Sequence, residues 1–457
     1  MKILSVIAEY NPFHNGHKLQ AGLARACTGC DFAIALMSGN FVQRGEPVIV
    51  DKYLRAKMAL DGGFDMVIEL PVYYACASAE HFAYNAVRIL NACGIVNSIA
   101  FGSESGNLKA LQETAQTLAN ETDEYRSSLH TELNSGKSFP QARDKALSTQ
   151  YSQLSTLNSQ LSTLNSPNDI LAIEYLKALN KTQSYITPIV IPRIGAGYHQ
   201  QEITGEIASA TAIRRAVCGT DGETGGRFSV SRREQFSSDK RIPSVRQRTV
   251  PLSHPVPSTM PEAAWSLLYN AFLKGNYVRG LDAYEREFRY ALLAHPQLED
   301  VLDISEGLQN RFLKMSGKFS SLSEIVSAVK TKRYTHTRLN RAALHILLDI
   351  RRYDFERFIA MDVPYIRVLG MKKTAGALMN ALSAAASCPV VTTLTPARSI
   401  LTADAWAMLE KEIAATDIYY LGLENRKPVA PGAEWRQGFV MDNGDGSQCP
   451  PTAPISR

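Results

Sequence analysis

Two histidines near the N-terminus lie three positions apart, in the run His14-Asn15-Gly16-His17. The run follows an apolar segment, residues 3–8, and precedes residues 18–27, where apolar side chains recur at helical spacing. A turn from strand to helix suits a nucleotide phosphate, because the free N–H groups of a helix N-terminus carry partial positive charge. Two surface histidines are the alternative. The placement after a first strand favours a nucleotide site, in which His14 and His17 stabilise charge that develops on an α-phosphate.

A second run, Ser209-Ala-Thr211-Ala-Ile213-Arg214, opens an amphipathic stretch after another apolar segment. Hydroxyl groups at a helix N-terminus can cap its free N–H groups, and Arg214 one turn later can reach β- and γ-phosphate oxygens. By itself the run could be an ordinary helix cap followed by a solvated arginine. Two such elements at opposite ends of one region make that alternative weak, so Arg214 joins the two histidines as a predicted catalytic residue.

The elements that must position these residues follow from the alternation of short apolar runs and amphipathic stretches before residue 218. Strands are predicted at residues 3–8, 32–37, 66–70, 98–102 and 186–192. Helices are predicted at residues 18–27, 51–60, 79–92 and 169–179. This order is typical of a doubly wound α/β fold with a parallel sheet.

The chain of 457 residues is long for one hydrophobic core, and its pattern changes along its length. Residues 1–218 form the predicted α/β domain, with an inserted loop at about 149–166 that contains a seven-residue segment in tandem copy. Residues 219–257 are rich in Gly, Ser and Arg and are predicted to be a flexible linker. Residues 258–425 are predicted to form a mainly helical second domain, and the Pro- and Gly-rich residues 426–457 a disordered tail.

Composition excludes some classes of protein. Charged residues make up 20% and hydrophobic residues 45%, and no apolar stretch approaches the roughly 20 residues of a membrane span. The apolar run at residues 3–8 is too short for a signal peptide, and an odd number of cysteines, seven, indicates reduced thiols. We therefore expect a cytoplasmic protein without membrane contact. Cys27 and Cys30 have the spacing of half a zinc site, but no second pair follows, and no metal site is predicted.

A basic segment lies in the predicted helical domain. Lys330, Lys332, Arg333, Arg338 and Arg341 fall within twelve residues that contain no acid, interleaved with Tyr334 and His336. Lysine and arginine contacts to phosphates, together with aromatic stacking, are a common way to hold RNA. A solvated helix face is the alternative. We favour RNA, because an enzyme whose reaction site lies in the first domain needs a second surface to hold a large substrate.

The two motifs also resemble known ones. The run His14–His17 resembles the HxGH signature of the nucleotidylyltransferase superfamily, and Ser209–Arg214 resembles its S-x-T-x-I-R motif. Further stretches resemble one family within it, the bacterial tRNA(Met) cytidine acetate ligases, from residue 1 to about 370: Ile7–His17, Ser38–Pro47, Val67–Pro71, Phe101–Glu104, Pro167–Tyr175, Ser305–Leu308 and Lys330–Arg338.

The resemblance implies a HIGH-type, Rossmann-like nucleotidyltransferase domain followed by a helical domain that binds tRNA. It implies that ATP, with Mg²⁺ expected to accompany it, activates acetate as acetyl-adenylate. The acetyl group then passes to N4 of the wobble cytidine of elongator tRNA(Met). The ATP-binding residues that it implies are Ile7, Ala8, Glu9, Tyr10, Asn11, Pro12, Phe13, His14, Asn15, Gly16, His17, Lys18, Leu19, Gln20, Gly102, Asn168, Arg193 and Ile194.

Two other functions fit part of the pattern. An adenylyltransferase that acts on a small phosphorylated coenzyme precursor would share the histidine motif, but it would not need the helical domain or its basic segment. A non-catalytic RNA-binding relative would share the fold, but the intact His14, His17, Thr211 and Arg214 argue against it.

Overall fold

The computed structural model describes residues 1–137, 141–143, 145–146, 166–193, 205–218, 256–295 and 297–443. The tandem heptads at 152–165 and the predicted linker as far as residue 255 lie outside these ranges. In the part of the chain that is described, no helix combines the length and the apolar character that crossing a bilayer requires.

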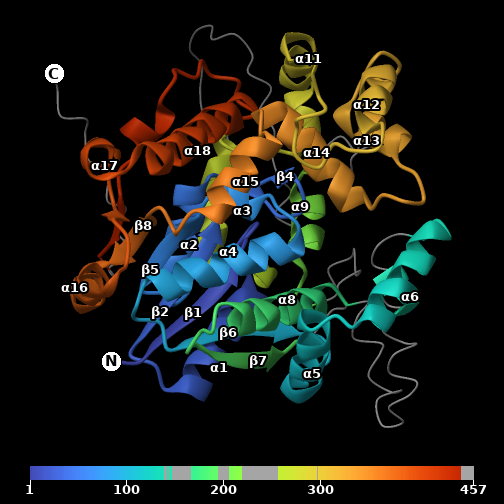
Figure 1. Cartoon of the computed structure of the whole chain (residues 1–457). Helices are drawn as coiled ribbons and strands as arrows, with labels where there is room; N and C mark the ends of the chain where they lie inside the picture. The colour runs from blue at the N-terminus through green and yellow to red at the C-terminus, as the bar shows by residue number, and fades with distance from the viewer. Residues whose placement is uncertain are drawn as a thin grey trace, which may run out of the picture.

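Five parallel strands form the centre of the molecule (Figure 1). They are β1 (Ile3–Ala8), β2 (Phe32–Ser38), β5 (Met66–Leu70), β6 (Ser98–Ser103) and β7 (Thr187–Pro192). Their order is β5-β2-β1-β6-β7, so the direction of winding reverses between β1 and β6. The doubly wound parallel fold is confirmed, and each predicted strand lies within one residue of its observed bounds. A crevice at the carboxyl ends of β1 and β6 is where such folds bind nucleotides.

Helices cover both faces of this sheet. α4 (Ala79–Ala92) and α8 (Pro167–Lys181) pack against one face, and α1 (Asn15–Thr28) and α2 (Lys52–Asp61) belong to the core of the other. Side chains of β2 alternate between the two cores: Ile34 and Leu36 point to the first, and Ala33 and Ala35 to the second. These side chains on both faces of β2 are fully buried, which explains why the sequence of such a strand is a continuous apolar run. Beyond α4, α5 (Leu108–Ala119) packs on α8 and is followed by α6 (Asp123–Asn134).

The region after residue 256 is mainly helical, as predicted. α9 (Ala210–Cys218) precedes it, and α10 (Glu262–Leu273) packs on α2. The next helices, drawn in yellow and orange, lie toward the carboxyl edge of the sheet in Figure 1. They are α11 (Glu285–Ala294), α12 (Leu308–Ser316), α13 (Leu322–Val329), α14 (His336–Leu348) and α15 (Arg352–Ala360).

The end of the chain differs from the prediction. β8 (Ile366–Lys372) pairs antiparallel with β5, and both β9 (Val390–Val391) and β10 (Val440–Asp442) pair with β8. Among the described residues the sheet therefore has eight strands and includes part of the supposed helical domain. β8 joins because Ile366 to Met371 are all buried against the first domain. The short strand β9 is followed by α17 (Leu394–Ile400). The C-terminal residues are therefore not a separate helical unit.

The predicted disordered tail from residue 426 is wrong for residues 426–443. They include η5 (Ala433–Arg436), which packs on α18 (Ala403–Leu421), and strand β10. The prediction failed because it counted apolar residues, whereas the side chain that anchors this segment is a buried acid, Glu434. Residues 444–457 lie outside the described ranges.

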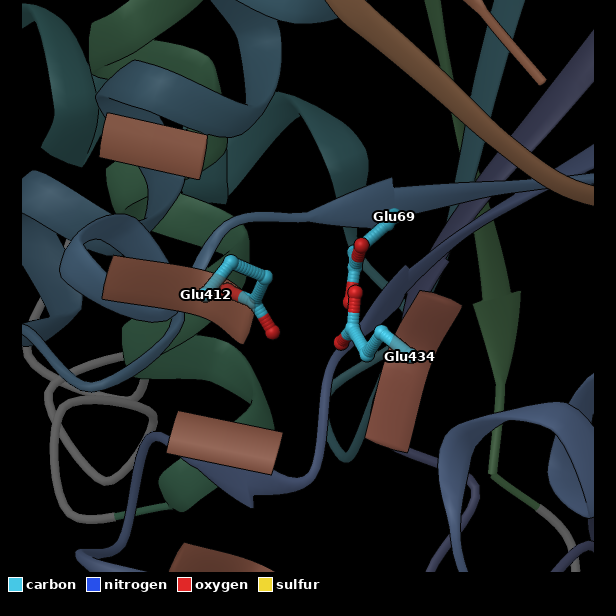
Figure 2. A group of neighbouring side chains, drawn as sticks. All are labelled: Glu69, Glu412 and Glu434. Atoms are coloured by element: carbon cyan, nitrogen blue, oxygen red, sulfur yellow. The ribbon is translucent and has the colours of Figure 1, made fainter. Parts of the chain in front are cut away.

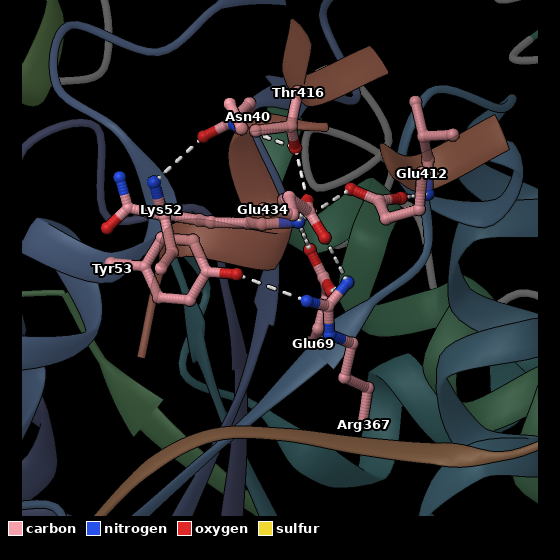
Figure 3. A network of polar contacts seen from close by, with 12 residues as sticks. Asn40, Lys52, Tyr53, Glu69, Arg367, Glu412, Thr416 and Glu434 are labelled. Atoms are coloured by element: carbon pink, nitrogen blue, oxygen red, sulfur yellow. Dashed lines mark hydrogen bonds and ion pairs between the residues drawn. The ribbon is translucent and has the colours of Figure 1, made fainter. Parts of the chain in front are cut away.

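Glu434 belongs to a buried charge network that we define as Lys52, Glu69, Arg367, Glu412 and Glu434. Figure 2 shows the three carboxylates converging from β5, α18 and η5, with oxygens within 4.8 Å of one another. This spacing could hold a metal ion, but the Lys52 ammonium group lies among them. Its Nζ is 2.6 Å from Glu69 and 3.2 Å from Glu412, and it also pairs with Glu434. Arg367 on β8 pairs with Glu69 and Glu434 (Figure 3).

The charges of this network balance when one acid carries a proton. Burial, together with the neighbouring Glu69 carboxylate, raises the pKa of Glu412 to about 8. Glu412 is therefore protonated at neutral pH, which leaves two carboxylates facing two cations. Despite burial, the Glu434 and Glu69 carboxylates hold the pKa of Lys52 above its ordinary value. The network thus joins α2 and β5 to the C-terminal segment with its charges neutralised from within.

Candidate active site

A cavity of about 680 Å³ opens at the carboxyl ends of β1 and β6. Its walls include the histidine run, Gly102 at the end of β6, the start of α8 and the start of α9. Thr335, Thr337 and Arg341, from the beginning of α14, complete it on another side. The structure therefore brings together the two sequence motifs, and it adds residues from the C-terminal part of the chain.

His14 and His17 lie on one face of the turn, as their spacing predicts. His14 is the N-cap of α1, and the two rings stack with centroids 3.7 Å apart. The backbone N–H of Gly16 donates to His14 Nδ1 at 3.1 Å, and the N–H of His14 donates to His17 Nδ1 at 3.3 Å. Because each Nδ1 accepts a hydrogen bond, each ring carries its proton on Nε2. Both side chains line the cavity and can offer it an Nε2–H donor.

Electrostatics keep these rings neutral. Burial, with Arg193 and Arg214 nearby, lowers the pKa of His14 to about 3. Burial, followed by the influence of His14 and Arg193, holds the pKa of His17 well below its ordinary value. The histidines thus act as neutral hydrogen-bond donors, and positive charge in the cavity comes from arginines.

Arg214 is held in place at the cavity wall. Its Nη1 donates to the carbonyl of Asn11 at 2.8 Å, and its Nη2 lies 3.2 Å from Glu46. The Ser209 hydroxyl accepts from the N–H of Ala212 at 3.1 Å, so it caps α9 as predicted. The charged residues that line the cavity are Arg44, Arg193, Arg214 and Arg341 against Glu9 and Glu46. Asp303, which is not among the lining residues, pairs with Arg341, so these groups leave an excess of one positive charge, which suits an anionic ligand.

Most of the implied ATP-binding residues line this cavity. They are Ile7, Ala8, Glu9, Tyr10, Asn11, His14, Gly16, His17, Leu19, Gln20, Gly102, Asn168 and Arg193. Pro12, Phe13, Asn15 and Lys18 do not. Phe13 is fully buried in the core, the Asn15 amide bonds to the carbonyls of Glu206 and Ser258, and Lys18 is exposed on α1. Ile194 lies outside the described residues.

The basic segment divides into two parts. Lys330, Lys332 and Arg333 are exposed, with Arg333 paired to Glu306 at 2.9 Å. Arg338 is half-buried, lies 5.0 Å from the Tyr334 ring and donates to Ser305. Arg341 is only 7% exposed and pairs with Asp303 at 3.0 Å. Arg341 is therefore not part of the exposed basic surface: it lines the cavity, and its partner Asp303 comes from outside the twelve-residue window, which itself contains no acid.

Sequence reasoning missed several residues of the cavity. Arg44 and Glu46 lie in the run Ser38–Pro47, which carries part of the family resemblance, but that resemblance implies no role for these two side chains. The sequence does contain a pattern that indicates a site here, because glycines and charged residues occur together in the run that follows a buried strand. Phe82 and Tyr175 come from helices that pack on the sheet, and nothing in their helical spacing distinguishes them from core residues.

The fold and this cavity define a nucleotidyltransferase of the HIGH type. The family model described as HIGH Nucleotidyl Transferase matches residues 1–430. Within that class, the chain belongs to the tRNA(Met) cytidine acetate ligase family. It is 38% identical over 426 residues to the tRNA(Met) cytidine acetate ligase of Thermoanaerobacter sp. strain X514, which covers 93% of this chain and 96% of the relative. It is 37% identical over 448 residues to that of Acetivibrio thermocellus, covering 96% and 100%.

A solved structure supports the same assignment. Thermotoga maritima TmcAL bound with alpha-thio ATP is similar with a TM-score of 0.83 and 30% identity, covering 97% of this chain and 100% of that one. The apo form of the same protein has a TM-score of 0.85.

Proposed function

We propose that this protein uses ATP to activate acetate and transfers the acetyl group to N4 of the wobble cytidine of elongator tRNA(Met). The observation that carries the proposal is that one cavity contains both the histidine motif and residues from α14. A nucleotide site alone would need only the first region, whereas a macromolecular substrate needs a surface that reaches the reacting atoms. Relatives named tRNA(Met) cytidine acetate ligase, and a similar protein solved with an ATP analogue, support it.

In the first step an acetate oxygen attacks the α-phosphorus of ATP, and pyrophosphate leaves. The Nε2–H groups of His14 and His17 donate to the phosphate oxygens on which charge develops. Arg214 and Arg193 stabilise the departing pyrophosphate. We expect Mg²⁺ to enter with the triphosphate, which supplies most of its oxygen ligands. The carboxylates that line the cavity lie near arginines, so no protein ligand to the metal is proposed.

In the second step the N4 amine attacks the acetyl carbon, AMP leaves, and the amine loses a proton. Of the two carboxylates lining the cavity, Glu46 pairs with Arg214, whereas burial raises the pKa of Glu9 and suits it to accept that proton. Glu9→Gln is expected to slow transfer to tRNA and to leave acetate-dependent pyrophosphate release intact. Equal loss of both activities would contradict this role.

The test of the whole proposal is ATP-dependent transfer of labelled acetate to a panel of purified tRNAs. Label should enter elongator tRNA(Met) and be recovered as N4-acetylcytidine, with one pyrophosphate released per acetate activated. Initiator tRNA(Met) and a tRNA(Met) transcript with uridine at the wobble position serve as matched controls. Pyrophosphate release with a phosphorylated coenzyme precursor, and none with acetate, would favour the small-molecule adenylyltransferase instead.

A further inference from the structure

The amide of Asn168 lies at the cavity wall and is held by a neighbouring acid. Asn168 is the second residue of α8, half-buried and facing the cavity. Its Nδ2 donates to Glu104 Oε1 at 2.5 Å, and the backbone N–H of Asp169 donates to Glu104 Oε2 at 3.1 Å. Both oxygens of one carboxylate are thus engaged by the first turn of α8. Ser166, the N-cap of this helix, makes no side-chain capping bond, so Glu104 takes over that role.

The loop after β6 and the first turn of α8 are clamped from both sides. The carboxylate of Asp169 is fully buried and accepts from the backbone N–H of Ser105 at 3.2 Å and from the Ser103 hydroxyl. The loop thus supplies the Glu104 carboxylate, which accepts from an N–H group of α8, and α8 supplies the Asp169 carboxylate, which accepts from an N–H group of the loop. Such reciprocal bonding fixes the backbone at Asn168, while the bond to Glu104 Oε1 fixes its side chain.

The position of Glu104 decides which end of the amide the cavity receives. A side-chain amide can offer either its oxygen or its nitrogen, but a carboxylate oxygen accepts, so the nitrogen of Asn168 must face Glu104. The amide oxygen then lies on the other side and needs a donor. In ATP the phosphates only accept, whereas the adenine 6-amino group and the ribose hydroxyls can donate.

We propose that Glu104 is a positioning residue that orients the Asn168 amide, so that its oxygen accepts a hydrogen bond from the adenosine part of the nucleotide. The inference rests on the proposed function, because it requires ATP to occupy the cavity. The anchor of Asn168 is thus Glu104, which lies 64 positions earlier in the chain.

The experiment measures equilibrium binding of ATP and three analogues to the full-length protein. Purine riboside triphosphate lacks the 6-amino group, and 2′-deoxy- and 3′-deoxy-ATP each lack one hydroxyl. The native protein should bind one of the three about 3- to 10-fold more weakly than ATP, the effect of one net hydrogen bond, and the affected analogue identifies base or ribose as the donor.

Glu104→Gln should reduce this preference to within about 2-fold, because its amide can either accept or donate and no longer fixes the orientation of Asn168. Asn168→Ala should abolish the same preference by removing the oxygen itself. Ser105→Ala is the matched control, because it removes a hydroxyl that lies 3.3 Å from Asp169 Oδ1 but keeps both bonds to Glu104. It should lower the melting temperature slightly and leave the preference unchanged.

A purely structural cap would shift the melting temperature of Glu104→Gln but leave the preference for ATP over the affected analogue at its native value. That result, or equal binding of all four nucleotides by the native protein, would overturn the inference and leave the proposed function standing. Failure of the native protein to bind ATP would instead overturn the proposed function as well.

Discussion

The cavity and the buried charge network use the same kinds of residue in opposite ways. The network places three carboxylates around two cations, and a proton on Glu412 brings its charge to balance. The cavity is lined by four arginines and two glutamates, and even with Asp303 paired to Arg341 one positive charge stays in excess among these groups, so its counterion is expected to be a ligand. Its two neutral histidines present N–H donors to the same space. Charges neutralised within the protein hold the fold together, whereas a surplus at a cavity indicates a place for an anionic ligand.

The largest expected effect is a loss of stability when the buried charge network is broken. Lys52→Met leaves the Glu69 and Glu434 carboxylates facing only one cation in a buried site, which is expected to lower the free energy of unfolding by about 3–5 kcal/mol. Urea denaturation followed by circular dichroism measures it. Arg126→Met is the control, because Arg126 makes exposed pairs with Glu121 and Asp123, and its replacement should cost about 1 kcal/mol or less. Equal losses in the two variants would remove the distinction between the network and an ordinary surface pair.

The next largest effect is on catalysis. His14→Asn or His17→Ala should slow acetate-dependent pyrophosphate release by about 10²- to 10³-fold, because each removes a donor to the transition state. Asparagine is preferable at position 14, since His14 caps α1 and alanine would also cost about 1 kcal/mol of stability. His130→Ala, on the exposed face of α6, should keep the native rate. A native rate in either cavity variant would rule out the proposed role of the motif.

Stability should depend on pH in opposite senses in the two regions. His14 has an ordinary pKa of 6.5 and a folded pKa of about 3, so its neutral form stabilises the fold above pH 6.5, and this contribution is lost as pH falls toward 3. Glu412 has an ordinary pKa of 4.5 and a folded pKa of about 8, so its contribution is lost as pH rises from 4.5 to 8. The urea concentration at the midpoint of unfolding should be measured across this pH range. It should fall less steeply toward acidic pH in His14→Asn, and less steeply toward alkaline pH in Glu412→Gln, than in the native protein. Parallel profiles of variants and native protein would contradict both assignments.

The smallest effect on the chemistry should come from exposed charges outside both regions. Replacing Lys330, Lys332 and Arg333 with alanine should weaken tRNA binding and leave acetate-dependent pyrophosphate release unchanged. The slope of log affinity against log salt should flatten by roughly 0.7 to 0.9 for each lost phosphate contact. Arg341→Ala, which alters the cavity wall, should instead reduce pyrophosphate release. An unchanged salt slope in the triple variant would identify these residues as an ordinary solvated face.

The sequence predicted what depends on neighbours along the chain. The parallel strands, their helices and the histidine turn all follow from local apolar periodicity and spacing, and the structure places them within a few residues of the prediction. The predictions that failed concern contacts between residues that are distant in the sequence. Lys52 and Glu412 are 360 positions apart, and Asp303 meets Arg341 from another segment. No local pattern marks such partners. The strand Ile366–Lys372 differs, because it contains a local apolar run, but it lies within residues 258–425, which are predicted to be mainly helical, and its partner β5 is about 300 positions away.

The late strands β8 and β10 also constrain the order in which the molecule can form. The chain is synthesised from its N-terminus, so β5 emerges about 300 residues before β8, the strand that covers its edge. Until then this edge is unpaired, and Lys52 and Glu69 lack Arg367, Glu412 and Glu434. An exposed strand edge beside incompletely paired charges is a hazard for aggregation. The nucleotide region, although it comes first in the sequence, therefore reaches its final form only after nearly the whole chain has been made.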